Sequence, residues 1–92
     1  MNKNVTVEYW NIDFEEDTAR FSLEDDDEGA SIIVDVVIKP ELERRTCSIE
    51  RVMDCWYLSD YDQRVEKTQI SKEELAIIKD ILENEYKKYL GE

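Results

Sequence analysis

The chain has 92 residues, of which 41% are hydrophobic and 39% are charged, and its formal net charge at pH 7 is −12. This length and composition predict one small acidic domain that spans residues 1–92 and buries a core of its own. The surplus of negative charge disfavours direct binding to nucleic acid or to an anionic membrane surface, because both would repel the protein.

Neither a signal peptide nor a membrane span is indicated. The first ten residues contain no apolar run of signal-peptide length, and no other segment approaches the length of a bilayer-crossing helix. We therefore expect a cytoplasmic protein. Cys47 and Cys55 agree with this expectation: a straight strand would separate them by roughly 27 Å, whereas a disulfide requires Cα atoms within about 7 Å. Both thiols are predicted to be free.

The first predicted element is a strand. Residues 5–9 alternate apolar and polar side chains, which is the two-residue period of a half-buried strand. From Trp10 onward the apolar side chains change parity, to Ile12 and Phe14. This change predicts a bulge near Asn11 or the end of the strand at that point.

Three further strands are predicted before the helix. Residues 19–23 form a short apolar strand that leads into an acidic turn at 24–29, and residues 31–39 form the most apolar strand, which Pro40 ends. A charged connection then leads to a long strand over residues 46–58, so these last two strands should form a hairpin.

The alternation assigns side chains to two faces of the predicted sheet. One face is predicted to carry Ile32, Val34, Val36, Ile38, Cys47, Ile49, Met53 and Cys55. The other is predicted to carry Ile33, Asp35, Val37, Val52, Trp56 and Leu58, with Trp10 as a possible addition. Arg51 interrupts the apolar pattern of its strand, and a bulge that places it near Asp35 would account for this.

A polar segment, residues 60–67, predicts a loop, and a helix follows it. Ser71 and Glu74 have the spacing of a capping box, and Gly91 provides a C-terminal stop. The predicted core-facing stripe is Leu75, Ile78, Leu82, Tyr86 and Tyr89, widened by Ile81 and Leu90. The complete prediction is an α+β domain: an antiparallel sheet of about four strands, followed by one C-terminal amphipathic helix packed on one face.

One helix covers only one face of such a sheet. The opposite face is therefore predicted to carry an apolar patch, which loops cover or which serves a partner or a homodimer, and which consists of Ile33, Val37, Val52, Trp56 and Leu58.

The most unusual feature of the sequence is its acidic stretch between residues 13 and 28. The stretch consists of Asp13, Glu15, Glu16, Asp17, Glu24, Asp25, Asp26, Asp27 and Glu28, with Arg20 as the one base. It contributes −8 of the total charge, and the like charges repel one another unless a basic partner uses them. Solubility is served by a net charge of about 2–8 in magnitude, so we infer that these nine residues, together with Trp56, are partner-binding.

The sequence also argues against most enzymes. The absence of histidine removes the usual nucleophile pairs and histidine metal sites, the cysteines lack metal or redox spacing, and two glycines cannot form a phosphate loop. Carboxylate pairs remain formally open as acid–base groups, but no motif supports them. We expect no enzymatic activity, no catalytic residues and no cofactor.

The acidic turn matches part of the pattern of a calcium-binding loop. Glu24, Asp26 and Glu28 alternate before Gly29, and Asp35 falls at the position of a twelfth ligand. A strand is predicted where the calcium motif requires a helix, and a solvated turn is the simpler interpretation. No dedicated metal site is expected.

Three functions remain. The first is a nucleic-acid-mimicking inhibitor of the anti-restriction or anti-CRISPR type, which would block a basic nuclease or another nucleic-acid-handling protein. Same-face residues of a strand recur roughly every 6.6 Å, comparable to adjacent phosphates, so a row of carboxylates could occupy a nucleic-acid groove. The second is a toxin-neutralising immunity protein or antitoxin. The third is a structural or dimerisation module whose acidity serves solubility.

Overall fold

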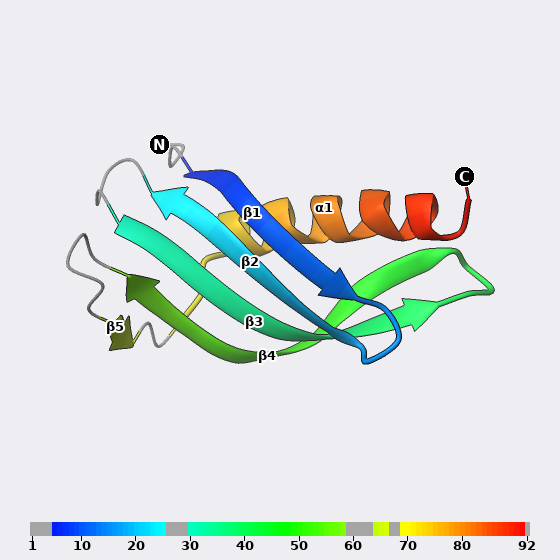
Figure 1. Cartoon of the computed structure of the whole chain (residues 1–92), viewed down its shortest axis with the longest axis horizontal. Coiled ribbons are helices and arrows are strands. Elements are labelled where there is room, and N and C mark those ends of the chain that lie inside the picture. Colours follow the sequence, from blue (N-terminus) through cyan, green and yellow to red (C-terminus); the bar gives the residue numbers. More distant parts are fainter. Residues whose placement is uncertain (1–4, 26–29, 59–63, 67–68, 92) are drawn as a thin grey trace.

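The computed structural model describes residues 5–25, 30–58, 64–66 and 69–91. Its elements are β1 (Val5–Asp13), β2 (Thr18–Asp25), β3 (Ala30–Glu41), β4 (Thr46–Leu58), β5 (Arg64–Glu66) and α1 (Lys72–Tyr89). Each strand pairs antiparallel with its sequence neighbours, in the order β1-β2-β3-β4-β5 (Figure 1). The predicted α+β fold, an antiparallel sheet followed by one C-terminal helix, is confirmed.

One strand was not predicted. β5 lies inside the segment 60–67 that the sequence indicates as a loop, and it pairs with the end of β4 at Trp56–Leu58. Three residues are too few to show an alternating pattern. β5 therefore forms because it pairs with the edge of β4, and its own sequence does not indicate a strand. The remainder of that segment, residues 60–63 and 67, lies outside the described residues.

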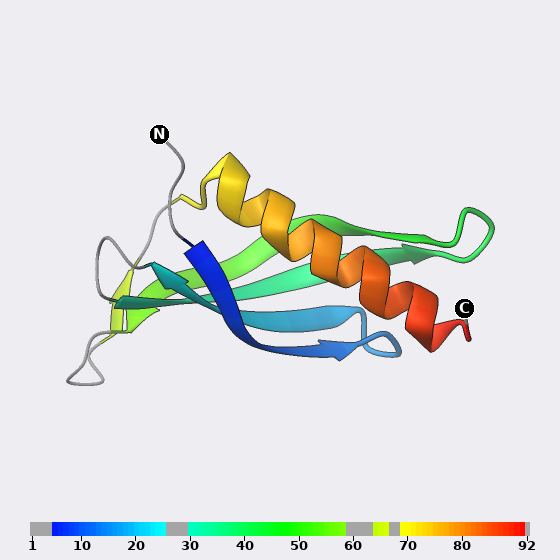
Figure 2. The ribbon, with the colours of Figure 1, turned by 90° about the horizontal axis from the view of Figure 1, so that it is seen from above.

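The helix covers one face of the sheet, and the core lies between them. Ile78 and Leu82 are completely buried and Tyr86 nearly so. They pack with the buried strand residues Ala19, Phe21, Leu23, Ile32, Val34, Val36, Ile38, Cys47 and Cys55. The predicted packing of the helix on the Ile32–Ile38 side of the sheet is therefore confirmed, and Figure 2 shows the helix crossing that face.

The start of α1 follows from its local sequence. The Ser71 side chain accepts a hydrogen bond from the Glu74 backbone N–H at 3.1 Å, and the Glu74 carboxylate accepts one from the Ser71 N–H at 3.1 Å. This reciprocal arrangement satisfies two N–H groups that no helical carbonyl can reach. The predicted capping box is confirmed.

The bulge in β1 lies at Glu8 rather than near Asn11. Val7 is opposite Leu23 and Tyr9 is opposite Ser22, so Glu8 is the extra residue. The shift brings Trp10 opposite Phe21, on the helix side of the sheet. The suggestion that Trp10 joins the open face is therefore wrong, and Tyr9 lies there instead.

Two bulges in β4 change the predicted faces. Between its pairings with Asp35 and Ile38 of β3, the strand carries two extra residues, Glu50 and Met53. Val52 consequently packs against the core, whereas Met53 is 46% exposed. The assignment of Val52 to the open face and of Met53 to the core was wrong, because strict alternation fails at each bulge.

Arg51 lies opposite Val37 and not beside Asp35. The proposed pairing of Arg51 with Asp35 is therefore also wrong. The residue opposite Asp35 on β2 is Arg20, and Arg20 forms the ion pair with the Asp35 carboxylate instead.

Pro40 does not end β3, which continues to Glu41. The Ile38 N–H points toward β2 and donates to the Asp17 carbonyl at 2.9 Å. Two residues further on, the ring nitrogen of Pro40 faces the same side, but β2 pairs with β3 only as far as Val37. No hydrogen bond between strands is lost there, so the proline is tolerated.

Candidate functional site: an acidic turn against the end of the helix

The β1–β2 turn carries four acids of the predicted site. Asp13 is the last residue of β1, and Glu15, Glu16 and Asp17 form the turn with Phe14. Asp13 Oδ1 accepts hydrogen bonds from the Glu15 and Glu16 N–H groups at 3.0 and 3.1 Å. Asp17 completes the turn in the left-handed region, with φ of 57°. The acids are thus held on a defined turn, and they do not form a straight row at strand spacing.

Phe14 anchors this turn on the helix. Its ring centroid lies 5.1 Å from that of Tyr86 and 4.8 Å from that of Tyr89. Tyr86 is 4% exposed and belongs to the core, whereas Tyr89 remains 57% exposed. The aromatic contacts therefore fix the turn against the last helical turns, while more than half of Tyr89 stays exposed to solvent.

The helix adds two carboxylates to those of the turn, at Glu83 and Glu85. Burial raises the pKa of Cys47 to about 11, and the negative charges of Asp17 and Glu83 contribute in the same direction. Turn and helix thus act together on one buried thiol. Because Glu83 and Glu85 are two residues apart, they lie on different sides of α1, so we call Asp13, Glu15, Glu16, Asp17 and Glu85 the turn–helix patch.

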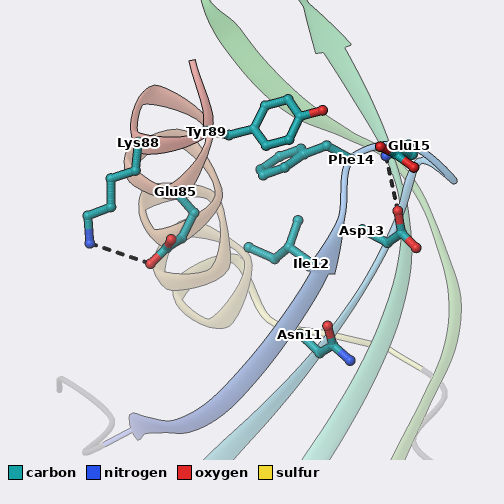
Figure 3. A pocket seen from close by; sticks show the side chains of 8 residues that line it. All are labelled: Asn11, Ile12, Asp13, Phe14, Glu15, Glu85, Lys88 and Tyr89. Carbon is teal, nitrogen blue, oxygen red and sulfur yellow. Dashed lines mark hydrogen bonds and ion pairs between the residues drawn. The ribbon is translucent and has the colours of Figure 1, made fainter. Parts of the chain in front are cut away.

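A surface hollow of about 520 Å³ lies between the turn and the helix. Its lining is Asn11, Ile12, Asp13, Phe14, Glu15, Glu85, Lys88 and Tyr89. Figure 3 shows Ile12, Phe14 and Tyr89 between the acids of the turn and the Glu85–Lys88 pair on the helix. The hollow combines an apolar and aromatic floor with carboxylates from two elements.

Glu24 and Asp25, also part of the acidic stretch, lie at the opposite end of the sheet. Glu24 and Asp25 end β2, whereas Asp17 directly precedes it. Eight residues of strand separate the two groups by roughly 25 Å. The three remaining predicted residues, Asp26, Asp27 and Glu28, lie outside the described residues. A stretch that is continuous in sequence is therefore divided in space, as the two ends of β2 in Figure 1 illustrate.

Trp56 lies on the open face, opposite Ile33, as predicted. Its side chain is only 8% exposed, and the Arg20 guanidinium carbon lies 5.4 Å from its ring centroid. Arg20 also donates to both Asp35 oxygens, at 2.6 and 2.8 Å, and this pairing raises the Arg20 pKa above its ordinary value. Trp56 therefore lies on the open face beneath the Arg20 guanidinium and presents little surface itself.

The residues of the calcium-like pattern do not meet at one site among those that can be placed. Glu24 is opposite Ser31, four positions along β3 from Asp35, and Asp35 is held by Arg20. In the described part of the chain, no group of three or more Asp, Glu, Cys or His side chains has the arrangement of a metal site.

Sequence reasoning missed six residues of the hollow: Asn11, Ile12, Phe14, Glu85, Lys88 and Tyr89. The helical period assigned Tyr89 to the core-facing stripe, and Phe14 was taken as a strand residue. The one local signal was the spacing of Glu85 and Tyr89, four residues apart and so on the same side of the helix. Their meeting with Phe14 depends on how the turn packs.

No protein-family model matches the chain, and no match was found among curated proteins or among solved structures. Within the described residues, no helix combines the length and the apolar composition needed to cross a lipid bilayer.

Proposed function

We propose that this protein binds a basic protein through the turn–helix patch and acts as a small acidic inhibitor of a nucleic-acid-handling partner. The observation that carries the proposal is that Asp13 and Glu15, from the end of β1 and the β1–β2 turn, line one hollow together with Glu85 of α1. Like charges brought together cost stability in the isolated chain, and an opposing basic surface removes that cost.

The contacts that hold the β1–β2 turn support this proposal. Asp13 holds the turn through two hydrogen bonds, and Phe14 holds it to the helix through two ring contacts. A turn whose backbone is held before binding loses less conformational freedom when a partner arrives. A solubility device would not require this fixation, because solvated acids serve that purpose on any mobile surface.

The test compares two sets of neutralising substitutions. The patch variant carries Glu15→Gln, Glu16→Gln, Asp17→Asn and Glu85→Gln. Asn at position 17 tolerates the left-handed conformation, and Asp13 is left intact because it holds the turn. As bait in native lysate at about 50 mM salt, the patch variant should lose the basic partner that the unmodified protein captures, and about 500 mM salt should release that partner.

The control variant has the same net charge but an intact patch. It carries Glu43→Gln, Glu50→Gln, Glu73→Gln and Asp80→Asn, all exposed positions outside the patch. It should retain the partner. Equal losses in the two variants would mean that total charge, rather than the patch, governs binding, and the third interpretation, an acidity that serves solubility, would then be favoured.

The inhibitor part of the proposal needs a second measurement. The purified partner is incubated with fluorescently labelled DNA or RNA, and the unmodified protein should displace the nucleic acid while the patch variant should not. A partner that keeps its nucleic acid in the presence of the bound protein would contradict the decoy mechanism. If that partner is a toxin whose activity is nevertheless lost, the immunity function is correct instead.

The second acidic group is tested separately. Replacing Glu24, Asp25, Asp26, Asp27 and Glu28 by their amides removes charge at the other end of β2. If this variant alone loses the partner, the binding site lies at that end and the turn–helix patch is not the interface.

A further inference from the structure

We propose that the hollow between the β1–β2 turn and α1 receives an arginine side chain of the basic partner, with its guanidinium stacked on Tyr89 and paired with Glu85. This inference deepens the proposed function and rests on it, since it names the side chain that the turn–helix patch recognises.

The lining of the hollow suits arginine. Ile12 and Phe14 offer apolar surface to an aliphatic stem, and Tyr89 offers a ring that is 57% exposed. A guanidinium is planar, stacks on aromatic faces and can donate two parallel hydrogen bonds to a carboxylate, whereas an ammonium group is a compact and strongly hydrated charge. A hollow lined by both an exposed ring and a carboxylate therefore favours arginine over lysine.

The open face of the same sheet already contains this arrangement. Arg20 donates to both oxygens of Asp35 while its guanidinium lies 5.4 Å from the centroid of the Trp56 ring. Its three parts are a carboxylate, an aromatic ring and a guanidinium. The hollow provides the first two, in Glu85 and Tyr89, and a guanidinium is not among its lining residues.

Lys88 is the group that the arginine must displace. Its ammonium lies 3.6 Å from Glu85 Oε1, and its side chain is 71% exposed. An ion pair of this length and exposure contributes little to stability. A bidentate guanidinium forms the stronger contact and can replace the lysine at Glu85.

The experiment titrates the protein at low salt with acetyl-Gly-Arg-Gly-amide and with its lysine counterpart, monitored by two-dimensional NMR. The arginine peptide should shift the resonances of Phe14, Glu85 and Tyr89 and bind about threefold more tightly than the lysine peptide. Equal affinities, or shifts confined to other residues, would overturn the inference.

Variants separate stacking from charge. Tyr89→Leu keeps apolar surface but removes the ring, and it should weaken arginine binding about threefold, whereas Tyr89→Phe should bind as the unmodified protein does. Lys88→Met should tighten binding more than Lys87→Met, because both remove one exposed positive charge but the Lys88 ammonium is the one paired with Glu85. Unchanged binding in Tyr89→Leu, or an equal effect of the two lysine substitutions, would contradict the arrangement.

The two proposals fail differently. If the arginine peptide shows no preference for the hollow while the four-residue patch variant still loses its partner, the arginine inference is wrong and the proposed function stands. If the peptide binds as expected while the patch variant keeps its partner, the proposed function is wrong. The hollow then binds arginine, but the basic partner is not bound through the turn–helix patch.

Discussion

Arg20 and Asp35 face each other across β2 and β3, and two hydrogen bonds of 2.6 and 2.8 Å join the guanidinium to the carboxylate. Asp54 lies opposite Asp35 on β4, so the arginine also offsets the repulsion between two neighbouring carboxylates. The Arg20 side chain is 55% exposed and that of Asp35 is 19% exposed.

A double-mutant cycle measures this pair. Arg20→Ala and Asp35→Ala should show a coupling of about 1 kcal/mol in urea unfolding, because the pair is bidentate and partly shielded. The control cycle uses Arg44 and Glu41, whose atoms lie 3.7 Å apart and whose arginine is 80% exposed. That coupling should be close to zero, and equal couplings would show that bidentate geometry contributes nothing here.

Leu82→Ala tests the contact between helix and sheet. Leu82 is completely buried in the core, so its truncation should lower the free energy of unfolding by about 2–5 kcal/mol. Leu42, which is 68% exposed, is the control, and Leu42→Ala should change stability by less than about 0.5 kcal/mol. A small effect at Leu82 would mean that α1 does not rest on the sheet in solution.

Because the Cys47 thiol is buried, we expect the protein to lose stability at high pH. The thiol is 1% exposed, and its pKa is raised from 9.0 to about 11 in the folded protein. The unfolded thiol ionises first, so the stabilisation is complete below pH 9 and is lost as the pH rises through 11. The loss should be about 2–3 kcal/mol.

Other groups titrate in the same pH range, so the contribution of Cys47 is isolated by comparing the unmodified protein with the Cys47→Ala variant. The difference in unfolding free energy between the two proteins should narrow from pH 8 to pH 11, as urea titrations at each pH will measure. A constant difference would contradict the raised pKa. A thiol reagent at pH 8 should modify Cys47 only as fast as the protein opens.

Asp17→Gly should stabilise the protein by about 0.5–1 kcal/mol, because glycine adopts a φ of 57° without the clash of a side chain. Glu16→Gly is the matched control: it removes one carboxylate from the same turn, but its backbone φ is not positive. It should lower stability by about 0.5 kcal/mol through the greater freedom of the unfolded chain. Thermal unfolding of both variants distinguishes strain from charge, since a pure charge effect would give shifts of the same sign.

Sequence predicted those features that local chemistry determines. The capping box requires only Ser71 and Glu74 at their spacing, and the helical stripe requires only the period of Ile78 and Leu82. The faces of β4 could not be derived, because a bulge at Met53 depends on how β3 pairs with the strand. A prediction from the sequence pattern assumes regular alternation, and each extra residue at a bulge exchanges the two faces for all later residues of the strand.

In the candidate site, too, one part was predictable from the sequence and another part was not. The acids of the turn were found from composition, which requires no tertiary information. Their separation from Glu24, however, follows from the path of β2, and their association with Glu85 follows from the contact of Phe14 with Tyr89. Charge density indicates that a surface is acidic, but only packing determines which acids share it.

The bulges at Glu50 and Met53 affect whether copies of this chain can associate through the β4 edge at high protein concentration. Within the described residues, β5 pairs with only the last three residues of the thirteen-residue β4. A long, regular, unpaired edge is a usual starting point for fibril growth, because a second chain can extend its ladder. Two bulges disturb the spacing of the hydrogen-bonding groups along that edge, and chains that each carry −12 repel one another before contact. Concentrated solutions should therefore remain free of fibrils even where the partner is absent.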